Sequence, residues 1–96
     1  MKLEFQPKAL EDLMSIQSYI ALDNIERANS FVDELIDACE HLLEHPDRSQ
    51  ALLRIDGHPI RRQPFGAYAI YYTVGETTTS ILRVVNSAMD QRNVFG

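Results

Sequence analysis

The sequence lacks the residues that would tie it to an oxidising compartment, a metal or a membrane. Its single cysteine, Cys39, can form no internal disulfide and no zinc site of the usual multi-cysteine type. No apolar run approaches the length of a membrane span, and Glu4 stands where a secretory signal needs an apolar core. We therefore expect a cytoplasmic protein that does not enter a membrane, and nothing in the sequence implies a cofactor or a metal site.

Length and composition predict one compact domain over residues 1–96. The chain has 96 residues, of which 45% are hydrophobic and 24% charged, the balance of a soluble globular protein. Charge is uneven, because residues 1–50 carry a net −7 and residues 51–96 a net +2. The total of −5 disfavours a protein that binds nucleic acid through phosphate contacts alone. The asymmetry suggests two faces with different partners.

The first half of the chain has the pattern of a short strand followed by two helices. Residues 3–5 alternate apolar and polar, and Pro7 suits the first turn of a helix that extends to about Leu22. Asp23 and Glu26 have the spacing of a capping box at the start of a second helix, which ends at His45 before Pro46. Residues 46–50 have turn composition. Each helix presents one apolar stripe, and the second stripe includes Cys39, which predicts a buried thiol.

The second half changes to the two-residue period of strands. Residues 60–63, 67–74 and 80–86 are rich in β-branched and aromatic residues and are separated by short turns. Short links require antiparallel neighbours. The sequence therefore predicts an α+β fold of order β-α-α-β-β-β, in which an N-terminal strand joins a mainly antiparallel sheet and the helical hairpin packs on one face.

Both faces of this predicted sheet carry apolar side chains. Tyr68, Ile70, Tyr72 and Val74 share one face of their strand. On the last strand alternation places Leu82 and Val84 on one face and Ile81, Arg83 and Val85 on the other. The hairpin can cover only one face, so the second is covered either by a partner or by the tail with Val94 and Phe95.

Four segments resemble the RelE/ParE superfamily of bacterial toxins, and the likeness is closest to ParE. They are ALEDLMSIQSYI at residues 9–20, LLEHP at 42–46, IRRQPFGAYAIYY at 60–72 and ILRVVNSAMD at 81–90. The resemblance implies the toxin of a type II toxin-antitoxin pair, neutralised by a cognate antitoxin in a hetero-oligomer and linked to DNA indirectly through that antitoxin. ParE-type members resemble inhibitors of DNA gyrase, whereas RelE-type members are ribosome-dependent endoribonucleases.

The tail favours the gyrase inhibitor, which would bind its target rather than catalyse a reaction. RNA cleavage needs an acid, a base and cations around the phosphate. Asn86 stands where many relatives have histidine and Met89 where many have arginine, and neither can carry a proton. The net charge of −5 also disfavours a ribosome-binding nuclease. The nuclease stays an alternative, as does a non-toxic module that acts only as a co-repressor with its antitoxin.

We predict no catalytic residue and a set of residues that contact the antitoxin or the target. Arg83 lies between two apolar residues, so it needs water, a partner or an ion pair with an acid such as Asp90. The predicted contact residues are Arg61, Arg62, Tyr68, Arg83, Asn86, Met89 and Arg92.

Overall fold

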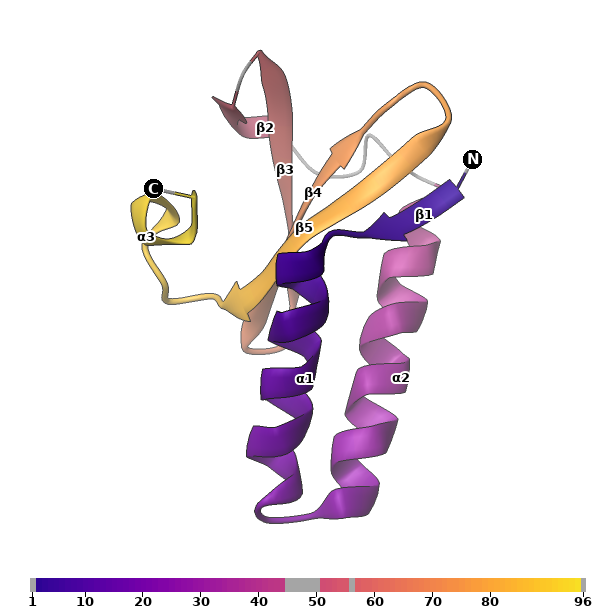
Figure 1. Ribbon diagram of the computed structural model, residues 1–96, viewed down its shortest axis with the longest axis vertical. Helices are drawn as coiled ribbons and strands as arrows, with labels where there is room; N and C mark the ends of the chain where they lie inside the picture. The colour runs from indigo at the N-terminus through magenta and orange to yellow at the C-terminus, as the bar shows by residue number, and fades with distance from the viewer. Residues whose placement is uncertain (1, 45–50, 56, 96) are drawn as a thin grey trace.

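A computed structural model describes residues 2–44, 51–55 and 57–95 (Figure 1). The elements in chain order are β1 (Lys2–Phe5), α1 (Pro7–Ala21), α2 (Ile25–His41), β2 (Ala51–Ile55), β3 (His58–Phe65), β4 (Tyr68–Val74), β5 (Thr78–Asn86) and α3 (Gln91–Phe95). The predicted α+β class and the helical hairpin are confirmed. No helix in this described part of the chain has the length and apolarity needed to cross a membrane.

The sheet has five strands in the order β1-β5-β4-β3-β2. Strands β2 to β5 pair antiparallel, and β1 pairs with β5 in parallel, from Lys2 opposite Thr78 to Phe5 opposite Ile81. The predicted order lacked β2, because ALLRI at residues 51–55 has no two-residue alternation. It also lacked the short helix α3. The chain therefore folds as β-α-α-β-β-β-β-α.

The two helices lie side by side and are joined by a tight connection (Figure 1). The carbonyl of Ile20 accepts hydrogen bonds from the amides of Asp23 and Asn24, which ends α1. Asn24 is extended, and its side chain accepts a bond from the Arg27 amide at 3.0 Å. The prediction of Asp23 as the capping residue was therefore wrong by one residue. The Asp23 amide bonds to the Ile20 carbonyl in the turn that ends α1, so the next residue, Asn24, caps α2.

The far end of the second helix also differs from the expectation. Helix α2 ends at His41, and the amides of residues 42–44 each bond to a carbonyl three residues earlier, a tighter turn than an α-helix. His45 and the predicted turn at residues 46–50 lie outside the described residues.

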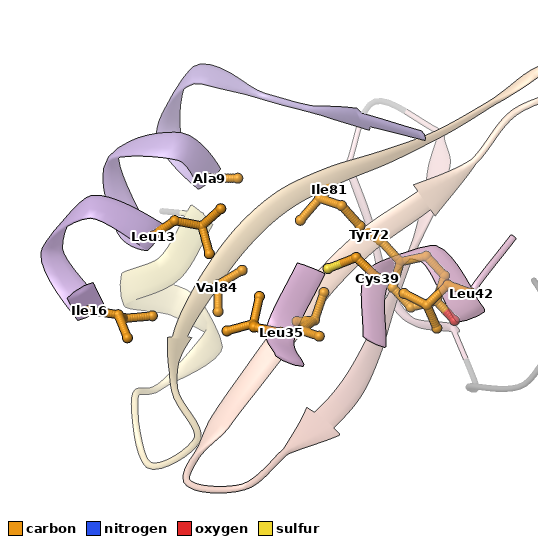
Figure 2. Packing of buried hydrophobic residues seen from close by; sticks show 10 residues of the cluster. Ala9, Leu13, Ile16, Leu35, Cys39, Leu42, Tyr72, Ile81 and Val84 are labelled. Atoms are coloured by element: carbon orange, nitrogen blue, oxygen red, sulfur yellow. The ribbon is translucent and has the colours of Figure 1, made fainter. Parts of the chain in front are cut away.

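The main core lies between the helices and one face of the sheet. Figure 2 shows Leu13 and Ile16 of α1 and Leu35 of α2 directed toward Val84 on β5. Tyr72 and Ile70 of β4 belong to the same buried cluster, together with Ala9, Cys39, Leu42 and Ile81. The predicted stripe on each helix and the shared face of Tyr68 to Val74 are confirmed.

A β-bulge changes which side chains of β5 meet this core. Tyr71 pairs with Arg83 and Tyr72 with Ile81, so Leu82 is an extra residue in the ladder. Consequently Ile81 and Val84 both face the helices, whereas Leu82 and Val85 lie on the other face. The predicted alternation along β5 was wrong, because one inserted residue reverses the phase of the side chains before it.

The opposite face of the sheet, called here the second face, has a smaller core of its own. Ile60, Ala69, Tyr71 and Val85 are buried there under Val94 of α3. Phe95 packs edge-on against Tyr71, with ring centroids 5.2 Å apart. The tail therefore covers part of this face, which was one of the two expected solutions.

Burial of Cys39 makes fold stability depend on pH above neutrality. Burial raises the pKa of the Cys39 thiol from its ordinary value of 9.0 to about 12, and the neighbouring Glu40 carboxylate adds to the shift. Between these values the unfolded thiol loses its proton and the folded thiol keeps it, so the free energy of unfolding should fall as the pH rises above 9.0. Urea unfolding of the wild type and of Cys39→Ala across this range checks the prediction. An identical decline in both proteins would contradict it.

Candidate functional site

A groove of about 690 Å³ opens on the part of the second face that α3 leaves uncovered. Its apolar lining comes from four strands and the tail: Ile55, Pro59, Ile60, Val74, Leu82, Val94 and Phe95. Thr73 and Ser80, paired across β4 and β5, contribute hydroxyls. Lys8, His58 and Arg83 also line the groove. It suits an apolar segment of a partner that brings hydrogen-bond acceptors or an acid to Lys8. We call it the second-face groove.

The tail that bounds this groove is held by its own capping residue. Asp90 accepts the amide of Arg92 at 2.9 Å and pairs with the Arg92 guanidinium at 3.0 Å. Its carbonyl accepts the amides of Asn93 and Val94. The bonds from Arg92 hold the pKa of the Asp90 carboxyl below its ordinary value. Asp90 therefore starts α3 and is not the partner of Arg83 that the sequence suggested.

Two of the predicted arginines share one cross-strand row with Tyr71. The register places Arg62 of β3 and Arg83 of β5 on either side of Tyr71 on β4. The Arg62 Nε donates to the Tyr71 hydroxyl at 3.3 Å, and its Nη2 donates to the Ser87 carbonyl at 3.2 Å. The Arg62 guanidinium also lies 6.0 Å from the centre of the Tyr71 ring. Tyr71, which the sequence did not single out, is therefore the centre of this row.

Arg83 is bound to Asp12, an acid from the opposite end of the sequence. Nε and Nη2 of Arg83 donate to the two Asp12 oxygens at 2.7 and 3.0 Å, a bidentate pair. The side chains are only 19% and 13% exposed. These bonds raise the pKa of Arg83 further above its ordinary value. A partner that contacts Arg83 therefore meets a guanidinium whose position is fixed by the Asp12 carboxylate of α1.

The same pair closes a gap in the sheet edge and holds the tail. Strand β1 pairs with β5 only as far as Ile81, so the edge of β5 has no strand neighbour beyond that residue. There one Asp12 oxygen accepts a hydrogen bond from the Val84 amide at 3.0 Å. The remaining nitrogen of Arg83 donates to the Val94 carbonyl at 3.0 Å. Asp12 and Arg83 thus connect α1, β5 and α3.

The structure disperses the other predicted contact residues. Arg61 lies opposite Tyr72, on the face that carries the helices, and Tyr68 packs there against Phe31, with centroids 5.6 Å apart. Asn86, Met89 and Arg92 are exposed or half-exposed in the tail, at or beyond the end of β5. The Asn86 side chain accepts the amide of Ala88 at 2.9 Å and so shapes the turn that leads to α3. Of the seven, only Arg62 and Arg83 lie in the cross-strand row.

Potential metal ligands and arginine side chains bear on the chemistry that the site can carry out. No group of three or more potential metal ligands lies together among residues 2–44, 51–55 and 57–95. The Arg62 and Arg83 guanidiniums are both engaged in internal bonds. The apolar lining of the second-face groove suits it to binding a partner.

The fold is that of a known toxin-antitoxin structure. The chain matches the chromosomal ParDE toxin-antitoxin system from P. aeruginosa with a TM-score of 0.74, over 90% of this chain and 95% of that chain. The two sequences are 21% identical, so this match establishes a shared fold. No curated protein matches the chain closely enough to count as a relative.

The sequence itself places the chain in a family. The family model of the ParE toxin of the type II toxin-antitoxin system parDE matches residues 3–91. The chain therefore belongs to the ParE toxin family, and the predicted resemblance is confirmed.

The Asp12–Arg83 pair gives a prediction for stability. Asp12→Ala leaves the partly buried Arg83 without its carboxylate and the Val84 amide without an acceptor, so it should lower the free energy of unfolding by about 2 kcal/mol or more. Denaturant unfolding measures the change. Glu11→Ala is the matched control, because it removes the neighbouring carboxylate of α1, whose ion pair with Lys8 is between side chains that are 68% and 72% exposed. Asp12→Ala with the stability of wild type would contradict the prediction.

Proposed function

We propose that this chain is a cytoplasmic toxin that inhibits DNA gyrase by binding it, and that a cognate antitoxin neutralises it in a hetero-oligomer. The observation that carries the proposal is the match of the ParE toxin family over residues 3–91, because ParE-type members resemble gyrase inhibitors. The antitoxin would also link the pair to DNA.

The chemistry of the arginines supports binding rather than RNA cleavage. A nuclease needs cations that are free to meet a phosphate as charge develops on it. Arg83 is instead held by Asp12, and Arg62 by the Tyr71 hydroxyl and the Ser87 carbonyl. The Asn86 side-chain amide shapes a turn and does not ionise, so it cannot act as a general acid or base. His58 lines the second-face groove and is the residue to substitute first if RNA cleavage is found.

The second-face groove is our proposed site for the antitoxin. Its lining is mostly apolar, and a groove of about 690 Å³ on a sheet face suits a helix or strand of a partner. The exposed Lys8 ammonium also lines it, so we expect a segment with apolar residues and at least one acid. Because α3 forms one wall, a bound antitoxin would also contact the tail.

Gyrase inhibition is tested with the purified chain, freed of antitoxin. It is titrated into gyrase with relaxed plasmid and ATP, and supercoiled and cleaved plasmid are measured. We expect supercoiling to be lost and cleaved plasmid to accumulate, and prior addition of the cognate antitoxin should restore supercoiling.

Two other outcomes would reject the gyrase proposal. Full supercoiling with cleavage of mRNA on ribosomes would assign the chain to the nuclease class. Full supercoiling with no RNA cleavage, and no growth arrest when the chain is induced alone, would leave the co-repressor module.

The antitoxin site is tested by Leu82→Glu. Leu82 lines the groove and is only partly buried, so a carboxylate there should weaken antitoxin binding at least tenfold with the fold retained, because it would lie against an apolar partner. Titration calorimetry measures the affinity. Met14→Glu, on an outward position of α1 that is 67% exposed, is the control and should bind like wild type. Equal affinity of both variants would place the antitoxin elsewhere.

A further inference from the structure

Large apolar side chains are exposed where the two helices meet. Leu22 is 87% exposed, Tyr19 72% and Ile25 67%, all within seven residues of one another. Scattered exposed leucines are ordinary, but a group of three at one connection is not. We call Tyr19, Leu22 and Ile25 the hairpin tip.

The hairpin tip is not needed to hold the helices together. The connection is closed by backbone bonds to the Ile20 carbonyl and by the Asn24 cap, and Gln17 donates to Asn29 across the two helices at 2.8 Å. Connections of this kind normally use polar residues or glycine. Tyr19 and Leu22 instead line a hollow of about 550 Å³, together with Asp23 and Arg27. Their exposure therefore needs a reason outside the fold.

Charge around the hairpin tip indicates what could cover it. Asp23 and Glu26 are exposed carboxylates, and the one arginine lining the hollow, Arg27, is paired with Glu34. A second copy of the chain would bring the same acids against them, on a protein whose net charge is already −5. A segment with apolar side chains flanked by lysine or arginine would satisfy both the apolar surface and the acids.

The tip lies far from the second-face groove. In Figure 1 the connection between α1 and α2 is at the bottom of the view, and α3 and β2, which bound the groove, are in the upper part. Lys8, in the first turn of α1, lines the groove and is fourteen residues from Leu22, about 21 Å along the helix axis. A partner in the groove therefore leaves the tip open to a different protein.

We propose that the hairpin tip is a docking surface for a basic, apolar segment of the target enzyme, separate from the surface that takes the antitoxin. The proposal rests on the proposed function, in which the target is DNA gyrase. The tip would supply affinity through Tyr19, Leu22 and Ile25, and Asp23 and Glu26 would select the basic partner.

The test compares two double variants of the full chain in binding to the intact gyrase tetramer, measured by biolayer interferometry. Leu22→Ser with Ile25→Ser should weaken gyrase binding at least tenfold and leave antitoxin affinity unchanged. Leu10→Ser with Met14→Ser is the matched control, because these residues are 49% and 67% exposed on α1 but away from the tip. None of the four residues is buried, so both proteins should fold, which far-ultraviolet circular dichroism verifies.

A charge-reversal pair tests the second half of the proposal. Asp23→Lys should weaken gyrase binding at low salt, whereas Glu76→Lys, an acid that is also exposed and lies in the turn between β4 and β5, should not.

Each outcome has a defined meaning. Gyrase binding by the tip double variant equal to that of wild type overturns the docking surface while leaving the proposed function intact. Loss of antitoxin affinity with gyrase binding retained also overturns it, because it assigns the tip to the antitoxin. Failure of wild type itself to bind gyrase rejects the proposed function, and the inference falls with it.

Discussion

The rest of the structure depends on one ion pair between residues 71 positions apart, Asp12 and Arg83. Strand β1 pairs with β5 only as far as Ile81, so beyond that point β5 has an edge with unpaired backbone groups. The Asp12 carboxylate takes up the Val84 amide of that edge, and Arg83 satisfies the Val94 carbonyl of α3. One carboxylate thus fixes α1 on the sheet and, through Arg83, fixes the tail on the second face. Because the tail bounds the second-face groove, the shape of the proposed antitoxin site depends on the contact between Asp12 of α1 and Arg83 of β5.

Much of this fold could be predicted from periodicity, and the misses have local physical causes. The helical stripes with Leu13 and Leu35 and the alternation from Tyr68 to Val74 identify the core face correctly, because each is a long regular pattern. The bulge at Leu82 could not be read from alternation, since an extra residue is visible only once the partner strand is in register. Strand β2 has no alternation and is specified by pairing with β3 instead. The capping residue was misplaced because aspartate and asparagine are about equally good N-cap residues, and only the geometry of the turn shows that Asn24 rather than Asp23 takes this position.

The candidate site was harder to predict than the fold, because it depends on which side chains meet across the sheet. The sequence identified Arg83 as a charge that needs a partner but named Asp90, which lies close in the chain, whereas the partner is distant Asp12. Adjacent Arg61 and Arg62 look equivalent in the sequence, yet pairing places them opposite Tyr72 and Tyr71 on different faces. The resemblance in residues 9–20 contained the missing signal, since it included Asp12, but a motif gives no indication of what a residue contacts.

The parallel pairing of β1 with β5 has a consequence for when the protein can fold. Strand β1 is synthesised well before its sheet partner in residues 78–81, and Asp12 well before its partners in residues 83 and 84. The helical hairpin can form early from local contacts, but its apolar stripe stays exposed until β4 and β5 have been synthesised. A nascent chain that stops before β5 therefore has neither the closed sheet nor the anchored tail. In a growing polypeptide the second-face groove can form only once β5 and α3 have been synthesised, so a partner that recognises it does not bind nascent chains that stop earlier.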